Sequence, residues 1–331
     1  MPVNLSVMEK HRLGRSDLLV NSVGLGCMGF SHAYGTPTEK TEAVKIIREA
    51  FDYGYDFFDT AECYTGVNLD GTISYNEEIV GAALKHIREK VVIATKFGVQ
   101  HLGTSLKMDS NPETIRKSVE GSLKRLGTDY IDLYYQHRID PEVSPEDVAS
   151  VMSELIREGK IRAWGISETD EDYLRRADAV CPVSAIQNRY SMMARWHEKL
   201  FPVLEELNIA FVAFSPMGNG LLSGKYSSES KFESSDFRSF MPQYTAEGFE
   251  KTRELLSLLE ELARKKNAAP GQISMAWMIC KKPYIIPIPG SRKLERIKEN
   301  FDAGKIVLTQ QEIEMLDEKL DTMKFLIFGG H

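Results

Sequence analysis

The sequence has few cysteines and no long apolar run, and these absences argue against several classes of protein. Its 331 residues include four cysteines, Cys27, Cys63, Cys181 and Cys280, which lie far apart and form no C-x-x-C pair. Neither a disulfide framework nor a zinc site is therefore expected. No segment approaches the roughly 20 apolar residues that span a bilayer, and the N-terminal MPVNLSVMEKHRLG lacks the apolar core of a signal peptide. We expect a cytoplasmic protein with reduced thiols and no membrane partner.

An excess of positive charge is also missing. The chain has 41 Lys and Arg residues against 48 Asp and Glu, a net charge of -7. This balance disfavours a broad surface for nucleic acid. No Pro-, Gly- or Ser-rich linker divides the chain. We therefore expect a single domain over residues 1–331.

Short apolar runs alternate with amphipathic stretches along the whole chain. The runs are NSVGLG near residue 24, then YDFF (55–58), VVIA (91–94), IDLYY (131–135), IRAWGI (161–166), VSAI (183–186), IAFVAF (209–214) and YIIPI (284–288). Helical periodicity appears between them, for example after Asn111-Pro112, after Ser144-Pro145 and over 41–53. Eight strand–helix repeats predict an α/β fold, the (β/α)8 TIM barrel.

The ends of the chain add to this pattern. The first twenty residues, with Gly14 at a turn, predict a β-hairpin that plugs the barrel floor. Residues 309–321 predict an extra C-terminal helix, and the tail FLIFGGH is expected to lie across the barrel. Residues 226–250 have no clear period and predict a long loop, which in a compact domain usually has a function.

One motif points to a different fold. Residues 24–29, GLGCMG, match the G-x-G-x-x-G fingerprint of Rossmann dinucleotide sites. That fingerprint must open a helix, whereas here FSHAYGTP follows, with Gly35 and Pro37 before helical periodicity begins. A short-chain dehydrogenase is disfavoured too, because no tyrosine is followed by a lysine four residues later. We therefore keep the barrel interpretation.

Polar residues follow the apolar runs, where the carboxyl ends of barrel strands build an active site. Asp59 and Tyr64 follow the second run, Lys96 the third and His137 the fourth. A nearby ammonium stabilises a phenolate, so we expect Lys96 to lower the pKa of Tyr64 and Asp59 to hold Lys96. His137 would hydrogen-bond a carbonyl oxygen. Each residue alone has an ordinary explanation, such as a cap or a buried core histidine, but their joint position favours an acid–base cluster.

These residues occur in motifs that closely resemble those of the aldo-keto reductase superfamily. The motifs are F-D-T-A-E-x-Y, A-T-K-F, Y-Y-Q-H-R and G-I-S, and the resemblance runs from RLGRSDLLVNSVGLGCMG to the closing FGGH. It implies a catalytic tetrad of Asp59, Tyr64, Lys96 and His137, with hydride passing from NADPH to a small-molecule carbonyl and Tyr64 protonating its oxygen. It also implies a metal-independent monomer. Within the superfamily, the sequence is most similar to a bacterial and plant branch with perakine reductase-like and auxin-induced-protein-like members.

The resemblance also implies which residues bind NADP(H). Ser167 and Gln187 match carboxamide-binding positions, and Phe214 matches the aromatic residue that stacks on the nicotinamide. The other cofactor positions are Gly29, Ser215, Met217, Gly218, Leu221, Lys225, Ser291, Arg292, Arg296, Glu299 and Asn300. Two arginines and a serine near residue 292 favour NADP over NAD. Glu168 departs from the family, in which many members have Asn after the serine.

The substrate pocket is expected to be lined by Phe30, Tyr34, Arg138 and Phe240, beside the 226–250 segment. Two other functions are weighed. A regulatory module that binds the nucleotide and turns over little, like the potassium-channel β subunits of the same superfamily, is disfavoured by the intact tetrad. A metal-dependent barrel hydrolase is disfavoured because the strand ends lack a His-x-His motif or a carboxylate-rich set.

Overall fold

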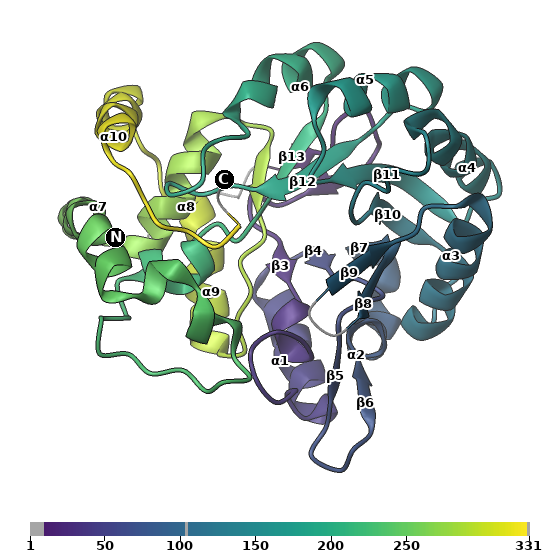
Figure 1. Cartoon of the computed structure of the whole chain (residues 1–331), viewed down its shortest axis with the longest axis horizontal. Helices are drawn as coiled ribbons and strands as arrows, with labels where there is room; N and C mark the ends of the chain where they lie inside the picture. The colour runs from purple at the N-terminus through teal and green to yellow at the C-terminus, as the bar shows by residue number, and fades with distance from the viewer. Residues whose placement is uncertain (1–9, 103–104, 330–331) are drawn as a thin grey trace, which may run out of the picture.

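Eight parallel strands form the centre of the molecule (Figure 1). The computed structural model describes residues 10–102 and 105–329. In chain order the strands are β3 (Leu25–Gly26), β4 (Phe57–Asp59), β7 (Val92–Phe97), β10 (Ile131–Gln136), β11 (Ile161–Ser167), β12 (Ala185–Arg189), β13 (Ala210–Phe214) and β14 (Ile285–Pro287). Each strand pairs in parallel with the next in this order. The predicted order of apolar runs is therefore confirmed.

The first and last of these strands also meet, which closes the sheet into a barrel. The Gly24 amide donates to the Pro287 carbonyl at 3.0 Å, and the Gly26 amide donates to the Pro289 carbonyl at 3.2 Å. A Cβ atom on Gly26 would stand only 2.7 Å from the Ile288 carbonyl oxygen. Glycine is thus required where the two backbones approach most closely. The G-x-G-x-x-G match marks this seam, and no α-helix begins there.

Helices surround the barrel and occupy most of the segments between strands. They are α1 (Lys40–Tyr53), α2 (Asn76–Leu84), α3 (Pro112–Leu126), α4 (Pro145–Arg157), α5 (Glu171–Val180), α6 (Phe201–Leu207), α7 (Ala246–Lys266), α8 (Pro270–Lys281), α9 (Leu294–Asp302) and α10 (Gln310–Thr322). Ser144 caps α4 by accepting a hydrogen bond from the Asp147 amide. Asn111 stands at the cap position of α3, but its side chain donates to Asp109 instead of capping the helix.

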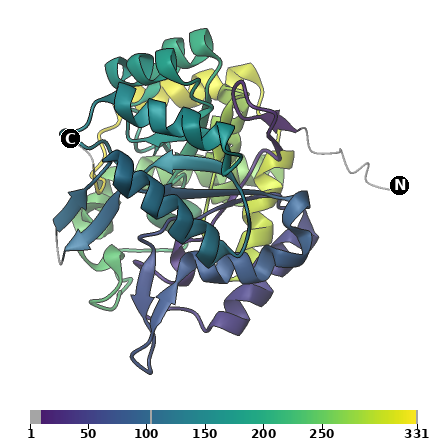
Figure 2. The ribbon, with the colours of Figure 1, turned by 90° about the vertical axis from the view of Figure 1, so that its right-hand side faces the viewer.

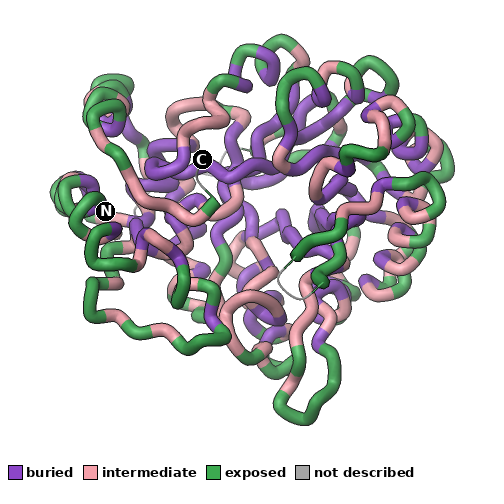
Figure 3. The backbone as a smooth tube through the Cα atoms, in the orientation of Figure 1, coloured by how far each residue is buried: buried purple, intermediate pink, exposed green. Residues whose placement is uncertain are grey.

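A β-hairpin closes the amino-terminal end of the barrel, as predicted. Strands β1 (His11–Arg12) and β2 (Leu19–Val20) pair antiparallel, and Leu13 and Leu18 pack among inward-facing barrel residues. Figure 2 shows this hairpin at one end of the barrel, and the C-terminal tail at the opposite end. The strands are buried almost along their whole length, whereas exposed residues lie on the outer helices and hairpin tips (Figure 3).

The structure adds elements that the sequence did not predict. Two antiparallel hairpins interrupt the segments after β4 and β7: β5 (Thr65–Val67) with β6 (Ile73–Tyr75), and β8 (Val99–Leu102) with β9 (Ser105–Met108). Short 3-10 helices cover residues 28–30, 85–90, 198–200, 218–223, 237–240, 242–244 and 303–305. The expected loop 226–250 is too long, because α7 begins at Ala246 with the Thr245 side chain as its cap.

Candidate active site

The alternation of side chains along each strand decides which residues face the barrel interior. Phe57, Val92 and Ala94 belong to an inner apolar cluster, and the neighbouring Phe58 and Ile93 pack outward against helices. The same alternation turns Asp59 and Lys96, at the carboxyl ends of β4 and β7, into the barrel. The inner cluster also contains Leu13, Leu18, Val20, Leu133, Tyr135, Ala163, Ala185, Ala210, Val212, Ile286 and Ile288.

Lys96 is the centre of the polar cluster. Its side chain has no exposed surface, and Nζ lies 2.5 Å from Asp59 Oδ1, 2.8 Å from the Thr60 carbonyl and 3.4 Å from Tyr64 Oη. Burial alone would lower the pKa of Lys96, but Asp59 and Tyr64 outweigh it and raise that pKa. Asp59 thus holds an ammonium against the tyrosine hydroxyl, in the arrangement expected from the sequence.

The effect of this contact on Tyr64 differs from the prediction. Burial raises the pKa of Tyr64 to about 12, and Lys96 offsets only part of this rise. The sequence led us to expect a lowered pKa. The expectation was wrong in sign because it included the charge of Lys96 and not the loss of water around the phenol. The hydroxyl therefore keeps its proton at neutral pH.

His137 follows β10 and stands beside Tyr64, with the two ring centres 5.6 Å apart and the planes nearly perpendicular. Burial, with help from Arg138 and Lys96, holds the pKa of His137 well below its ordinary value. The imidazole is therefore neutral. Cys63 Sγ lies 3.4 Å from His137 Nδ1, and burial raises the pKa of the Cys63 thiol to about 12. Cys63 is therefore a buried, protonated thiol.

The residues matched to the nicotinamide end lie on neighbouring strands. Ser167 Oγ donates to the Gln187 carbonyl at 2.9 Å, and Gln187 Nε2 donates to Asp59 Oδ2 at 2.7 Å. Gln187 is thus tied directly to the acid–base cluster, a contact that the sequence did not reveal. Phe214 ends β13 and is partly exposed, with the Arg189 guanidinium carbon 5.0 Å from its ring centre.

The segment after β13 turns sharply, as expected of a chain that wraps a phosphate. Ser215, Gly218, Asn219 and Gly220 all have positive φ, with Gly220 at 102°. The amides of Gly218 and Gly220 close this turn by donating to the carbonyls of Ser215 and Met217, both at 3.0 Å, and the two glycines leave the backbone open to close approach. Leu221 is buried beneath this turn, and Met217 packs against the core.

The residues matched to the adenosine end follow β14, across the seam from Gly29. Arg292 donates to the carbonyls of Gly29 and Thr36, and its Nη2 is buried with no hydrogen-bond partner. Arg296 is instead paired with Glu299, which also lies 3.6 Å from Lys225. Ser291 Oγ accepts from the Lys293 amide, and Asn300 is buried. Of the two arginines, Arg292 is therefore the one with a buried donor that lacks a partner.

Three of the four residues expected in the substrate pocket lie near the barrel mouth, the opening at the carboxyl ends of the eight strands. Tyr34 accepts a weak hydrogen bond from Asn219, Arg138 donates to Ser167 Oγ, and Phe240 is 57% exposed. Phe30 does not fit the expectation, since it is 1% exposed and packs in the outer core between barrel and helices. We leave it out of the pocket.

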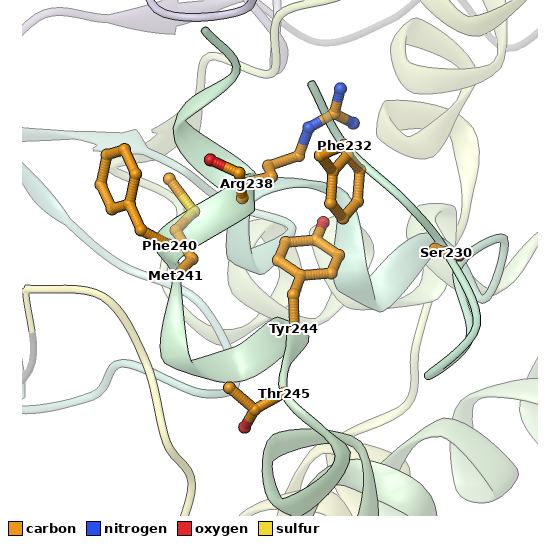
Figure 4. Close-up of a pocket in the computed structure, with 8 residues that line it drawn as sticks. Ser230, Phe232, Arg238, Phe240, Met241, Tyr244 and Thr245 are labelled. Atoms are coloured by element: carbon orange, nitrogen blue, oxygen red, sulfur yellow. The ribbon is translucent and has the colours of Figure 1, made fainter. Parts of the chain in front are cut away.

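Part of the mouth is built by the 226–245 segment (Figure 4). A cavity of about 210 Å³ lies between its residues, with the Phe232 and Tyr244 rings 4.8 Å apart. The Arg238 guanidinium carbon lies 4.5 Å from the Phe232 ring centre, and Arg238 forms an ion pair with Asp236. The cavity is further lined by Ser230, Ser239, Phe240, Met241 and Thr245.

Three residues of the mouth, His32, His101 and Arg189, were not predicted from the sequence. His32 stacks on Tyr64 at 5.9 Å between ring centres, and His101, on the β8–β9 hairpin, lies 4.9 Å from His32. No sequence signal identifies His101, because its hairpin was not predicted. Arg189 could have been found, since it stands two residues after Gln187 on β12 and so faces the same side.

Within residues 10–102 and 105–329, no group of three or more His, Cys, Asp or Glu side chains could hold a metal ion. No helix in this part of the chain is long and apolar enough to cross a membrane.

The chain is similar to known proteins over most of its length. Residues 22–321 match the model of the aldo/keto reductase family. The chain is 37% identical to probable aldo-keto reductase 1 of Glycine max over 310 residues, 93% of this chain and 87% of that protein. It is 35% identical to aldo-keto reductase yakc of Schizosaccharomyces pombe, whose name specifies NADP(+), over 93% of this chain and 90% of that one.

Solved structures agree with the fold. The glycerol dehydrogenase AKR11B4 from Gluconobacter oxydans superposes with a TM-score of 0.81 at 30% identity, covering 94% of this chain and 95% of that one. An aldo/keto reductase from Klebsiella pneumoniae, solved in complex with NADP and acetate, superposes with a TM-score of 0.72 at 25% identity, covering 97% of this chain and 99% of that one.

Proposed function

We propose that this chain, which belongs to the aldo/keto reductase family, is an NADP(H)-dependent reductase of aldehydes and ketones in which Tyr64 donates the proton. The observation that carries the proposal is the buried Lys96, which contacts both Asp59 and the Tyr64 hydroxyl. A lysine without exposed surface that touches a phenol beside an open barrel mouth is typical of an acid–base site.

The residues matched to the cofactor have the chemistry that NADP(H) requires. The unpartnered Nη2 of Arg292 offers a donor for a phosphate, and the glycines at 218 and 220 let a ligand approach the backbone of the left-handed turn closely. The yakc relative carries NADP(+) in its name, and the Klebsiella structure contains NADP. When bound, the reduced nicotinamide supplies the hydride. We expect Phe214 to carry the ring, Ser167 and Gln187 to bind its carboxamide, and Arg292 to favour the 2′-phosphate.

The chain's own residues then account for the proton. Tyr64 keeps its hydroxyl proton at neutral pH because burial raises its pKa to about 12, so the group can serve as an acid. As the proton leaves, Lys96 stabilises the phenolate that forms, and Asp59 holds the ammonium in place. The neutral His137 donates a hydrogen bond to the carbonyl oxygen and orients it.

Turnover by Tyr64→Phe tests the proposal. Oxidation of NADPH and of NADH would be followed with 4-nitrobenzaldehyde and a small set of ketones. Loss of general acid catalysis should lower kcat by about 10²- to 10⁴-fold, and NADPH binding, followed by its fluorescence, should persist. Tyr53→Phe is the control, because the Tyr53 hydroxyl bonds Asp302 on the outside of the barrel.

Two results would contradict the proposal. Equal activity of Tyr64→Phe and wild type would remove Tyr64 as the acid. A wild-type protein that binds NADPH tightly but reduces no carbonyl on the panel would instead favour a nucleotide-binding regulatory module.

A further inference from the structure

Two arginines at the barrel mouth have no acidic partner. Arg138 follows His137 at the end of β10, and Arg189 ends β12. Within the part of the chain that the structure describes, neither forms an ion pair, whereas Arg238 at the same mouth is paired with Asp236. Arg189 is moreover 9% exposed and is the one buried arginine among the described residues. A buried guanidinium without a carboxylate is costly, so its presence calls for an explanation.

The neighbours of the two arginines are aromatic or neutral. The guanidinium carbon of Arg138 lies 6.0 Å from the centre of the Phe214 ring. The guanidinium carbon of Arg189 lies 5.0 Å from the same ring centre and 5.8 Å from the centre of the Phe328 ring. Arg138 donates to the His137 carbonyl and to Ser167 Oγ, and Arg189 donates to Asn219 Oδ1 at 3.3 Å. None of these partners neutralises a positive charge.

The nearest acid is already engaged. Glu168, after β11, accepts the Arg189 backbone amide at 2.8 Å through Oε1, and its Oε2 lies 3.8 Å from His197 Nε2. Its carboxylate forms an ion pair with neither guanidinium, and its charge offsets only part of the fall that burial causes in the pKa of Arg189. One acid between two arginines leaves a local excess of positive charge beside the acid–base cluster.

The position of Arg138 separates it from the proposed phosphate-binding segments. Those segments follow β13 and β14, and β10 stands on the far side of the closed barrel from β14. Arg138 is instead the sequence neighbour of His137, which faces the reacting carbonyl in the proposed mechanism. Burial raises the pKa of Tyr64 and of Cys63, and the charge of Arg138 offsets a small part of each rise.

Resting on the proposed function, we propose that Arg138 and Arg189 bind a carboxylate on the substrate, so that the preferred substrates are flat carbonyl compounds carrying a carboxylate. A guanidinium presents paired donors that match a carboxylate, and the burial of Arg189 strengthens such a contact. The rings of Phe214, Phe240 and Phe328 make an apolar wall beside the arginines, which suits a planar body. Phe240 is seen at the edge of the neighbouring cavity in Figure 4.

The test compares matched substrates that differ in one charge. The 2-, 3- and 4-formylbenzoates would be assayed against their methyl esters with wild type, Arg138→Gln, Arg189→Gln and Arg189→Lys. For at least one isomer, the wild type should show a kcat/KM about ten-fold or more higher for the acid than for the ester. Each Gln variant should reduce that ratio by about 10- to 100-fold, the effect of one lost charge-assisted hydrogen bond, because kcat/KM falls much further for the acid than for the ester. Arg189→Lys keeps the charge and should restore part of the ratio.

A control and a direct binding measurement accompany the kinetics. Arg253→Gln removes the same charge from the exposed outer helix α7 and should leave the ratio unchanged. Calorimetric titration of wild type and variants with NADP+ present should show that 4-(hydroxymethyl)benzoate binds wild type more tightly than its methyl ester does. Kd for NADPH, from its fluorescence, should stay within about two-fold of wild type in both Gln variants.

Three outcomes would overturn the inference, and they are distinguishable. Equal use of acid and ester by wild type would refute the carboxylate site while leaving the reductase proposal intact. A parallel loss for acid and ester, with a weaker Kd for NADPH, would assign the arginines to the cofactor. Reduction of neither compound, nor of 4-nitrobenzaldehyde, would contradict the reductase proposal itself.

Discussion

Removing the charge of Asp59 should destabilise the fold as well as the reaction. In Asp59→Asn the ammonium of Lys96, which has no exposed surface, keeps only the Thr60 carbonyl and the Tyr64 hydroxyl as partners. Breaking one side of a buried ion pair costs about 3–5 kcal/mol, because an uncompensated charge remains. Lys96→Met removes that charge. The double variant should therefore be less destabilised than the sum of the single variants, by about 2 kcal/mol.

Wild type, the two single variants and the double variant form a double-mutant cycle. Urea unfolding followed by tryptophan fluorescence would measure the free energy of unfolding of each of the four proteins. The exposed pair Glu250–Arg253 supplies a matched cycle with Glu250→Gln and Arg253→Met, in which the coupling should stay below about 0.5 kcal/mol. A free energy of unfolding of Asp59→Asn within about 1 kcal/mol of that of wild type would contradict this expectation, as would additive effects of the Asp59 and Lys96 substitutions.

Three further outcomes follow from the geometry. Because burial raises the pKa of Tyr64 to about 12, the acid form persists below that pH, and the rate of carbonyl reduction should be constant from about pH 6 to 10. The rate of alcohol oxidation, which needs the phenolate, should rise with pH. A reduction rate that falls near pH 8 would contradict this. Burial likewise raises the pKa of Cys63 to about 12, so a thiol reagent such as iodoacetamide should leave Cys63 unlabelled at pH 7.4 in the native protein, as mass spectrometry of peptides can establish. Gly26→Ala places a Cβ about 2.7 Å from the Ile288 carbonyl and should destabilise the protein by roughly 1–3 kcal/mol in urea unfolding, whereas Gly121→Ala, which meets only the flexible end of a side chain in α3, should be neutral or stabilising.

The strand pattern predicted the centre of the site because barrel geometry converts a sequence position into a place in space. A residue at the end of a parallel strand lies at the carboxyl rim, and period-two alternation turns it inward. These two rules predict the positions of Asp59 and Lys96, and in the structure Lys96 Nζ lies 2.5 Å from Asp59 Oδ1. The same rules would have identified Arg189.

Other features depend on contacts that a single sequence does not carry. The hairpins after β4 and β7 rest on tertiary packing: a Cβ on Gly66, in β5, would stand 2.0 Å from the Ser31 carbonyl, on a loop thirty-five residues earlier. The pKa of Tyr64 depends on how far water is excluded, so its rise could not be read from the neighbouring Lys96 alone. Ion pairing likewise separated Arg292 from Arg296, which looked equivalent in the sequence.

The seam between β3 and β14 has a consequence for the synthesis of the chain. The first barrel strand emerges about 260 residues before its second neighbour, so at roughly 5–20 residues per second the ribosome needs about 13–52 s to deliver that neighbour. Throughout that time β3 has an open hydrogen-bonding edge, which is the kind of edge that other chains can pair with. β3 has two residues, Leu25 and Gly26, and offers little edge for such pairing. The shortness of this strand therefore protects the nascent barrel until its last strand arrives.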